Sequence, residues 1–263
     1  MKLSISNIGW SAENDSAIYS KMKSYGFEGL EIAPTRVFTE NPYDRLEEAI
    51  KWAGELKANY GFAVPSMQSI WYGRTEKLFG TEEERKALAD YTKKAIDFAS
   101  AIHCKNLVFG CPRNRNMPEG ADSKIAIEIF REIGDYAAKK GTVIGMEANP
   151  PIYNTNFIND TQSALELIED VASEGFKLNL DMGTMIENGE DISVLKGHED
   201  CINHVHISEP GLKQIVKREL HSQLADLLKA SSYKGYVSIE VGCQEDISEL
   251  DIMMKYVKEV FGE

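Results

Sequence analysis

The stretch Cys201-Ile-Asn-His-Val-His-Ile-Ser-Glu-Pro210 contains two histidines that alternate with aliphatic residues. This alternation predicts a short β-strand, and Pro210 excludes a helix that would run through the end of the stretch. Because side chains two positions apart on a strand point to the same side, His204 and His206 share one face. If that face lines the inside of a barrel, His206 lies at the mouth and His204 lies one layer deeper, as a hydrogen-bonded residue of the core.

Seven further apolar segments have the length and composition of strands. They span residues 3–8, 29–33, 62–67, 106–109, 142–148, 176–181 and 236–241. Amphipathic segments separate them, which predicts helices over residues 15–25, 43–60, 81–102, 122–140, 160–174, 191–196, 214–231 and 247–261. Gly26 and Gly61 are typical helix C-caps, and Thr81 with Glu84 forms a capping box.

The alternation of strands and helices predicts an α/β protein with a parallel sheet. No proline-rich or low-complexity linker interrupts the pattern, and 263 residues is the usual size of one (β/α)8 barrel. We therefore predict a TIM barrel that forms a single domain over residues 1–263. A doubly wound open sheet is the alternative, but that fold usually has a glycine-rich turn after its first strand. Residues 7–10 contain only one glycine.

The chain is acidic, with a formal net charge of −13 from 42 acidic and 29 basic residues. This charge opposes binding to a phosphate backbone or an anionic membrane, so we expect neither nucleic acid nor membrane partners. The sequence shows no secretion signal, no apolar run of membrane-spanning length and no Cys-x-x-Cys pair among its four cysteines. We expect a cytoplasmic protein without a disulfide framework, and the sequence leaves a homo-oligomer open.

Four consecutive predicted strands each carry a metal-ligand type of residue to the end where the loops of a barrel meet. These residues are Glu147, Asp181, His206 and Glu240, with spacings of 34, 25 and 34 residues that each match about one β-α unit. Any one of these acids alone would be an ordinary surface residue. Glu147 and Glu240, however, lie inside apolar segments, where an unpaired charge is costly. Three carboxylates and one imidazole suit one divalent ion such as Mn²⁺, Mg²⁺, Co²⁺ or Zn²⁺.

The same residues carry a family resemblance. Glu147 in Gly-Met-Glu-Ala-Asn-Pro, Asp181 in Leu-Asn-Leu-Asp-Met-Gly, His206 in His-Val-His-Ile-Ser-Glu and Glu240 in Ser-Ile-Glu-Val resemble the metal-ligand signature of the xylose-isomerase-like barrel superfamily. The resemblance covers essentially the whole chain and is greatest to sugar isomerases and epimerases such as the ketose 3-epimerases. It implies that Glu147 and Glu240 bind the metal and also form an acid/base pair, with Asp181 and His206 as pure ligands.

An enzyme of this kind would act on a small sugar or sugar phosphate. One glutamate would remove the proton alpha to the carbonyl, and the other would return a proton to a different face or carbon of the enediolate. One alternative is a metal-dependent dehydratase or lyase of a polyol or keto-acid. Another is a barrel that binds metal or sugar without catalysis.

The superfamily also contains an apurinic endonuclease, which this sequence disfavours. That branch uses histidines on the third and fourth strands, whereas the third strand here offers Gln68 and the fourth offers no histidine. Ketose epimerases and endonucleases also have a histidine three residues after the sixth-strand aspartate, where this chain has Thr184. His221 falls where the endonucleases have a zinc ligand, but we assign it to substrate binding.

Further residues near the predicted barrel mouth are candidates for substrate binding. Arg113 and Arg115 follow the fourth strand and would suit a phosphate or carboxylate if they converge, although solvated surface charge explains them equally well. Glu209 could bind a sugar hydroxyl. Trp10 and Trp71 could stack on the apolar face of a sugar, although core packing explains them nearly as well. The full predicted set is Glu209, Thr184, His221, Arg113, Arg115, Gln68, Trp10 and Trp71.

Overall fold

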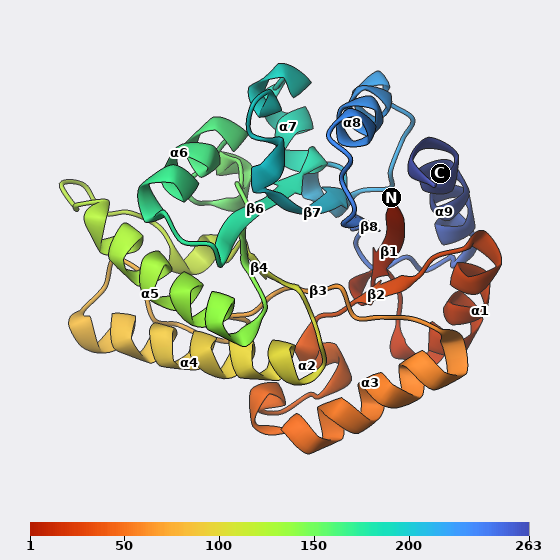
Figure 1. Cartoon of the computed structure of the whole chain (residues 1–263), viewed down its shortest axis with the longest axis horizontal. Coiled ribbons are helices and arrows are strands. Elements are labelled where there is room, and N and C mark those ends of the chain that lie inside the picture. Colours follow the sequence, from red (N-terminus) through yellow and green to blue (C-terminus); the bar gives the residue numbers. More distant parts are fainter. Residues whose placement is uncertain (263) are drawn as a thin grey trace.

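The computed structural model describes residues 1–262 and shows a (β/α)8 barrel (Figure 1). Within these residues eight parallel strands pair in the order β2-β1-β8-β7-β6-β5-β4-β3. Two isolated parallel bridges, Gly29 with Ala63 and Ile32 with Met67, join β2 to β3 and close the ring. The strands are β1 (Lys2–Ser6), β2 (Gly29–Glu31), β3 (Ser66–Met67), β4 (Asn106–Phe109), β5 (Ile144–Met146), β6 (Phe176–Asp181), β7 (Ile202–Ile207) and β8 (Tyr236–Ile239).

Helices surround the strands on the outside of the barrel (Figure 1). Within the described residues they are α1 (Asp15–Tyr25), α2 (Pro34–Val37), α3 (Leu46–Tyr60), α4 (Glu82–Ala101), α5 (Lys124–Lys140), α6 (Thr161–Val171), α7 (Met182–Asn188), α8 (Glu219–Ala230) and α9 (Ser248–Phe261). The predicted single-domain barrel is confirmed, and the Thr81 capping box of α4 is present. None of these helices is both long enough and apolar enough to cross a lipid bilayer.

The sequence prediction differs from the structure after β6. The short helical stretch expected around residues 191–196 is a 3-10 helix (Ile192–Leu195). The regular helix α7 instead begins directly after Asp181, whose side chain accepts a hydrogen bond from the Thr184 amide and caps the helix. The helix predicted over 214–231 is also shorter, because residues 214–218 form a loop and α8 begins at Glu219.

The inside of the barrel is polar, whereas most TIM barrels fill it with branched aliphatic side chains. Buried side chains hydrogen-bond between strands: Gln68 donates to Ser6 Oγ (2.7 Å), and Asn106 donates to Ser66 Oγ (3.0 Å) and to Asn179 Oδ1 (3.1 Å). The hydrophobic core lies between strands and helices and includes Leu3, Ile5, Leu107, Phe109, Leu178, Leu180, Val205 and Ile207. The alternation along each strand therefore separates an apolar shell from a polar interior.

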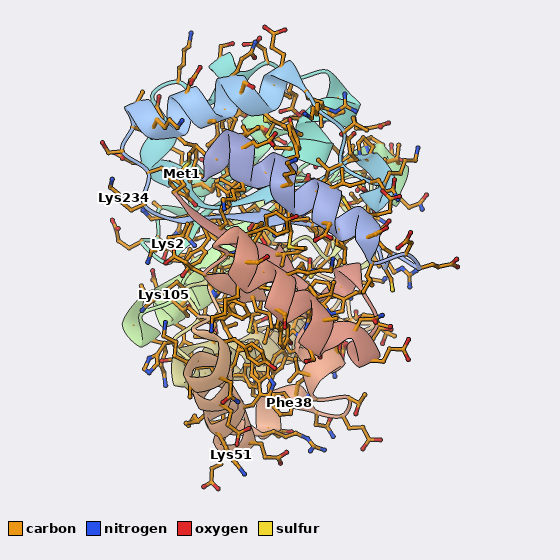
Figure 2. The ribbon with its side chains drawn as sticks, turned by 90° about the vertical axis from the view of Figure 1, so that its right-hand side faces the viewer. Met1, Lys2, Phe38, Lys51, Lys105 and Lys234 are labelled. Atoms are coloured by element: carbon orange, nitrogen blue, oxygen red, sulfur yellow. The ribbon has the colours of Figure 1, made fainter. Side chains whose placement is uncertain are left out.

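The side view in Figure 2 identifies the two ends of the barrel. Lys2 begins β1, while Lys105 and Lys234 lie just before β4 and β8, and all three occupy the left side of the picture. That side is therefore the N-terminal end of the strands. The opposite end, where active sites of such barrels lie, carries the loops that follow the strands.

Candidate active site

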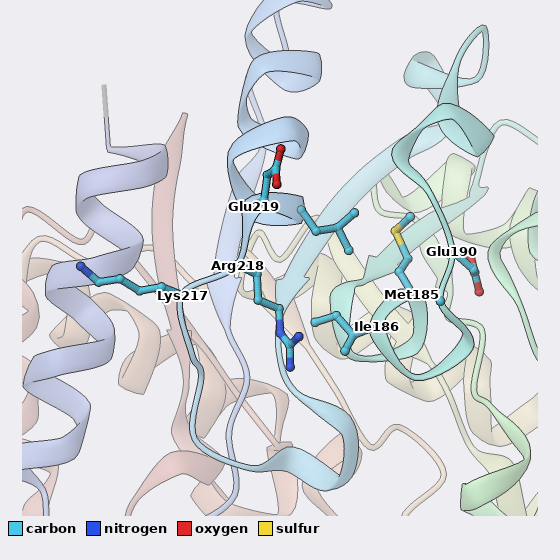
Figure 3. A pocket seen from close by; sticks show the side chains of 8 residues that line it. Met185, Ile186, Glu190, Lys217, Arg218 and Glu219 are labelled. Carbon is cyan, nitrogen blue, oxygen red and sulfur yellow. The ribbon is translucent and has the colours of Figure 1, made fainter.

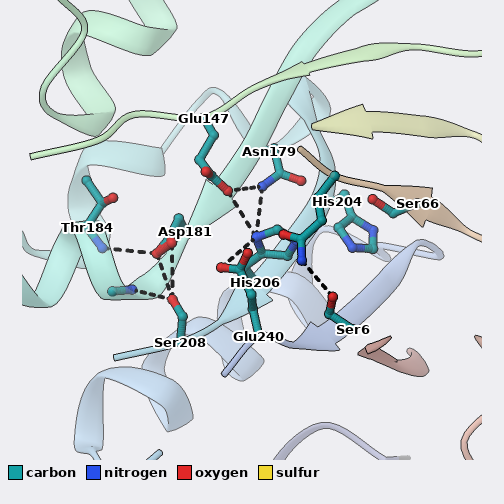
Figure 4. Close-up of polar contacts among 12 residues, drawn as sticks. Ser6, Ser66, Glu147, Asn179, Asp181, Thr184, His204, His206, Ser208 and Glu240 are labelled. Atoms are coloured by element: carbon teal, nitrogen blue, oxygen red, sulfur yellow. Dashed lines mark hydrogen bonds and ion pairs between the residues drawn. The ribbon is translucent and has the colours of Figure 1, made fainter. Parts of the chain in front are cut away.

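Four side chains converge at the C-terminal end of the barrel (Figure 4). Glu147 follows β5, Asp181 ends β6, His206 is in β7 and Glu240 follows β8. Each contributes one ligand atom, and these four atoms all lie within 4.8 Å of one another. The structure thus brings together the four residues that the sequence singled out as metal ligands.

His206 is at the centre of this cluster and is fully buried. Its Nδ1 lies 3.0 Å from Glu147 Oε1 and 3.3 Å from Glu240 Oε2. Its Nε2 lies on the other side of the ring, 3.0 Å from Glu31 Oε2. The Nδ1 atom therefore faces the carboxylates of the candidate metal site.

Local structure holds Asp181 in place. Its Oδ1 accepts hydrogen bonds from the Thr184 amide (3.0 Å) and from Ser208 Oγ (2.7 Å). Ser208 Oγ in turn accepts one from the Gly183 amide (2.8 Å). A Cβ at Gly183 would lie 2.8 Å from Ser208 Oγ and 3.0 Å from Asp181 Oδ1, so only glycine permits this close approach. The Asp-Met-Gly-Thr sequence therefore caps α7 and orients a carboxylate at the same time.

Glu147 is held through both its side chain and its backbone. Its Oε1 accepts from Asn179 Nδ2 (2.8 Å), and its Oε2 accepts a longer bond from Asn149 Nδ2 (3.3 Å). Its backbone carbonyl accepts from Nη1 of the buried Arg115 (2.8 Å). A Cβ at Gly110 would lie 2.8 Å from Glu147 Oε2, so the glycine after β4 leaves room for this carboxylate.

Burial and like charges shift the pKa values of the cluster. Burial, and then the charges of Glu147 and Glu240, raises the pKa of Asp181 to about 7. Burial also raises the pKa of Glu240, against the opposing charge of His206. Burial would lower the pKa of His206, but the carboxylates of Glu31, Glu240 and Glu147 outweigh it and hold this pKa well above its ordinary value. These residues therefore retain protons that a bound cation would displace.

The chemistry of the cluster fits a divalent cation. Three carboxylates this close together repel one another, and among the described residues of this cluster only His206 can carry a counter-charge. Carboxylate oxygens with one imidazole nitrogen suit Mn²⁺, Mg²⁺, Co²⁺ or Zn²⁺. Glu147, Asp181, His206 and Glu240 could therefore hold one such ion.

A cavity of about 180 Å³ opens beside the cluster. Three of the four cluster residues, Glu147, Asp181 and Glu240, contribute to its wall. The rest of the wall comes from β4 and from the loops after β3, β4, β5 and β7, and consists of Gln68, Ser69, Val108, Gly110, Cys111, Pro112, Asn149, Tyr153 and Leu212. The cavity can therefore bring a small ligand next to the carboxylates.

Among the predicted substrate contacts, Gln68 lines this cavity. Thr184 is buried, and its hydroxyl donates to the Ala148 carbonyl (2.8 Å). The side chain of Glu209 is paired with Arg218, whose Nε donates to its Oε1 (2.7 Å). Neither Thr184 nor Glu209 belongs to the described cavity wall.

The two predicted tryptophans are core residues. Trp10 is 1% exposed and donates its indole N–H to Asp15, and Trp71 is 2% exposed and donates to Thr92. His221 is likewise fully buried, with Nδ1 2.9 Å from the Tyr256 hydroxyl. The described cavity wall includes none of these three predicted residues, because each is committed to packing.

The two predicted arginines do not converge. Arg115 is fully buried and donates to the carbonyls of Glu147 (2.8 Å) and Ile158 (3.1 Å). Burial lowers the pKa of Arg115 to about 10. Arg113 is exposed to solvent. The pair therefore does not form the anion-binding fork that the sequence suggested.

Sequence reasoning missed Glu31. This residue is fully buried in β2, with Oε2 2.9 Å from His204 Nε2 and 3.0 Å from His206 Nε2. Burial would raise the pKa of Glu31, but His206 and His204 outweigh burial and hold this pKa below its ordinary value. A signal was present, because Glu31 sits in the apolar segment Gly-Leu-Glu-Ile-Ala, as Glu147 and Glu240 sit in theirs. The prediction of His204 as a buried polar core residue agrees with this contact.

A second cavity, of about 420 Å³, lies between α7 and the start of α8. Figure 3 shows the side chains that line it. Its wall includes Met185, Ile186, Glu190, Lys217 and Arg218. None of the four cluster residues contributes to it. The smaller cavity at the barrel mouth is therefore the candidate active site, because it alone of these two adjoins the candidate ligands.

Comparison with solved structures supports the fold assignment. A D-psicose 3-epimerase, crystallised in the presence of D-fructose, is 16% identical, with complete coverage of both chains and a TM-score of 0.81. The 3-keto-D-glucoside 4-epimerase of E. coli is 21% identical, covering 97% of this chain and 98% of that one, with a TM-score of 0.77. An AP endonuclease, family 2, from Brucella melitensis is 22% identical, covering 97% and 99%, with a TM-score of 0.72. At such identities the likeness shows the fold alone.

No curated protein matches the chain. The family model described as xylose isomerase-like TIM barrel matches residues 19–258. This match covers most of the chain and includes β2 to β8 with all four cluster residues. The chain therefore belongs to the xylose isomerase-like TIM barrel family.

Proposed function

We propose that this protein is a divalent-metal-dependent isomerase or epimerase of a small sugar. The observation that carries the proposal is the placement of Glu147 and Glu240 on one imidazole nitrogen, 3.0 Å and 3.3 Å from His206 Nδ1, with both carboxylates in the wall of one cavity. Epimerisation through an enediolate needs two groups that exchange protons with the same substrate. The structural similarity to epimerases agrees with this reaction class.

The two glutamates have different surroundings, which suits different roles. Glu147 accepts amide hydrogen bonds from Asn179 and Asn149, which hold its two oxygens in place in the cavity wall. Burial raises the pKa of Glu240 and favours its protonated form as an acid. We propose that Glu147 removes the proton alpha to the carbonyl and that Glu240 returns a proton. Isomerisation in the reverse direction would exchange these roles.

Glu147, Asp181, His206 and Glu240 would hold the cation. Bound there, a divalent ion would supply Lewis-acid stabilisation of the negative charge that develops on the substrate oxygens. Asp181 and His206 have no proton-transfer role in this proposal. Hydrogen bonds from Ser208 fix the orientation of Asp181, and the contact with Glu31 fixes the orientation of His206.

The cavity wall favours an uncharged sugar. None of its described residues is a lysine or arginine, and Arg115 and Arg218 make their hydrogen bonds within the protein. Asn149 Oδ1, by contrast, is buried in this wall without a hydrogen-bond partner among the described residues. A buried acceptor of this kind is satisfied by a ligand hydroxyl. We therefore propose that Asn149 and Gln68 bind substrate hydroxyl groups and that the reacting part of the sugar carries no phosphate.

Incubation with a panel of ketoses and ketose phosphates in D₂O tests the proposal. Deuterium should enter one or more free ketoses at the carbon next to the carbonyl, without loss of water, when Mn²⁺ or another divalent ion is present. Loss of water with formation of a deoxy product would instead identify a dehydratase. Absence of exchange with every sugar would overturn catalysis and leave a binding protein.

A further inference from the structure

Glu31 lies on the opposite side of the His206 ring from the candidate metal site. It is 0% exposed, and the described cavity wall does not include it. Its Oε2 is 3.0 Å from His206 Nε2 and 2.9 Å from His204 Nε2. A carboxylate only accepts hydrogen bonds, so this contact requires a proton on His206 Nε2.

A second contact defines the other ring nitrogen. Asn179 Nδ2 lies 3.3 Å from His206 Nδ1 and donates to Glu147 Oε1 (2.8 Å). The orientation of this amide follows from a chain of bonds, because Asn203 Nδ2 donates to Asn106 Oδ1 (2.8 Å) and Asn106 Nδ2 donates to Asn179 Oδ1 (3.1 Å). An amide nitrogen therefore faces His206 Nδ1 at 3.3 Å, but the carboxylate oxygen Glu147 Oε1 is closer, at 3.0 Å, so both ring nitrogens face carboxylates in the metal-free site. A cation bound among the cluster carboxylates would replace the proton on Nδ1, because Glu31 holds the proton on Nε2.

The sequence also preserves the space that this arrangement needs. Gly145 of β5 lies against the two asparagines, and a Cβ there would be 2.4 Å from Asn106 Oδ1 and 3.0 Å from the Asn179 Cβ. Any larger residue would displace the amide chain. The asparagines and Glu31 thus approach His206 from opposite sides, and Glu31 accepts the hydrogen bond on the Nε2 side.

We propose that Glu31 is a positioning residue that holds His206 with its proton on Nε2, so that Nδ1 is the metal-binding atom. Histidine ligands of metals commonly donate their second ring N–H to a carboxylate, which fixes the ring and strengthens the ligand. This inference rests on the proposed metal-dependent function. It adds a residue from β2 to a site whose other members come from β5 to β8.

The three residues Glu31, His204 and His206 also have ligand atoms within 4.8 Å of one another, as a metal site would. All three are fully or almost fully buried, and their closest atoms lie at ordinary hydrogen-bond distances of 2.9 and 3.0 Å. Metal bonds to nitrogen or oxygen ligands are about 2.0–2.2 Å long, and the metal needs space between its ligands. Hydrogen bonding between His206 Nε2 and Glu31 therefore accounts for the close approach of these two residues, whereas the nearby His204 Nε2 has no hydrogen-bond partner among the described residues.

Nuclear magnetic resonance of the whole protein labelled with ¹⁵N-histidine tests the proton position directly. With Zn²⁺, which is diamagnetic, the spectrum of His206 should show a protonated Nε2 and an Nδ1 resonance shifted by the metal. The variant His206→Gln identifies the signals of His206, because they disappear from its spectrum. Coordination through Nε2 in the wild type would overturn the inference without any change to Glu31. This measurement does not depend on catalytic activity or on knowing the substrate.

The variant Glu31→Gln removes the charged acceptor and keeps its shape. Titration with Mn²⁺ and Zn²⁺ should show affinity weakened by about 10- to 100-fold, the usual effect of losing such a partner. Glu31→Asp, which keeps a carboxylate, should retain more affinity than Glu31→Gln. The control is Ser238→Ala, because Ser238 pairs in register with His206 but its buried hydroxyl has no hydrogen-bond partner among the described residues. That variant should bind both ions like the wild type.

The outcomes separate this inference from the proposed function. Equal affinity and an unchanged His206 proton position in Glu31→Gln would overturn the role of Glu31 but leave the metal site intact. A wild type that binds neither ion would overturn both. If circular dichroism shows that Glu31→Gln does not fold, the NMR spectrum of the wild type and the metal affinity of Glu31→Asp still test the role of Glu31.

Discussion

His206 Nδ1 lies 3.0 Å from Glu147 Oε1, although 59 positions separate the two residues in the chain. Each side chain leaves the C-terminal end of a different parallel strand, and closure of the barrel brings these ends together. The contact joins the most buried member of the cluster to one of the two proposed proton carriers.

The first prediction concerns metal content. Protein purified without chelators should contain about one divalent ion per chain, because the four ligand atoms form one cluster. Asp181→Asn should weaken Mn²⁺ binding at least about tenfold, since it removes a ligand outright. Asp191→Asn is the matched control, because Asp191 is exposed and caps a 3-10 turn, a role that asparagine can also fill. Equal binding by both variants would remove Asp181 from the site.

The second prediction concerns proton transfer. Glu240→Gln should reduce deuterium exchange into the substrate by about 10²- to 10⁴-fold, because the amide can no longer carry the proton. The thermal midpoint should not fall at neutral pH, since glutamine replaces a buried acid whose pKa is raised by burial. Glu245→Gln, in the exposed loop after β8, should exchange at the wild-type rate. Wild-type exchange by Glu240→Gln would exclude Glu240 from the mechanism.

The third prediction concerns pH. Between about pH 6.5 and about pH 8 the metal-free protein should become less stable. The pKa of Asp181 is raised to about 7 and that of His206 lies well above its ordinary value, so in this range the folded state holds protons that the unfolded state releases. The free energy of unfolding therefore falls as the pH rises. The buried His204 and His221 have lowered pKa values, so at about pH 6.5 the unfolded state binds protons at these residues that the folded state lacks, which makes the decline shallower there. At about pH 8 both residues are neutral in both states.

Urea unfolding at several pH values in this range, with chelator and then with saturating Mn²⁺, measures the effect. The metal should abolish or reverse the decline, because it binds the deprotonated ligands of the folded state and stabilises that state. A metal-free protein whose stability is constant or rises across the range would contradict the pKa shifts at Asp181 and His206.

The fourth prediction compares two neighbouring arginines. Arg115→Lys should destabilise the protein by about 1–3 kcal/mol, because a lysine cannot reproduce the planar donors that reach the carbonyls of Glu147 and Ile158. Arg113→Lys, on the exposed side of the same loop, should stay within about 0.5 kcal/mol of the wild type. Chemical denaturation of the two variants provides the comparison. Equal stability would show that the buried arginine is dispensable.

Much of the barrel was predictable from local patterns. The strands over 106–109 and 176–181 and the helix over 15–25 have the predicted limits, because hydrophobic periodicity and glycine C-caps depend on neighbouring residues. The strand predicted over 142–148 is shorter, at Ile144–Met146. The helix α7 was missed because Asp181, interpreted as a metal ligand, is also its N-cap.

The candidate ligands could be named in advance because each is the polar residue at the end of a predicted strand, and parallel strands end on the same side of a barrel. The partners of these ligands could not. Glu31 meets His206 across 175 positions, Arg115 turns inward while Arg113 stays outside, and Trp10 and Trp71 pack into the core. Periodicity records which face of an element a residue occupies, whereas barrel closure and side-chain packing select the distant atoms that it contacts. The amino-acid pattern thus specifies the barrel and the candidate metal ligands, and the folded chain specifies how each ligand is oriented and which polar groups remain free for substrate.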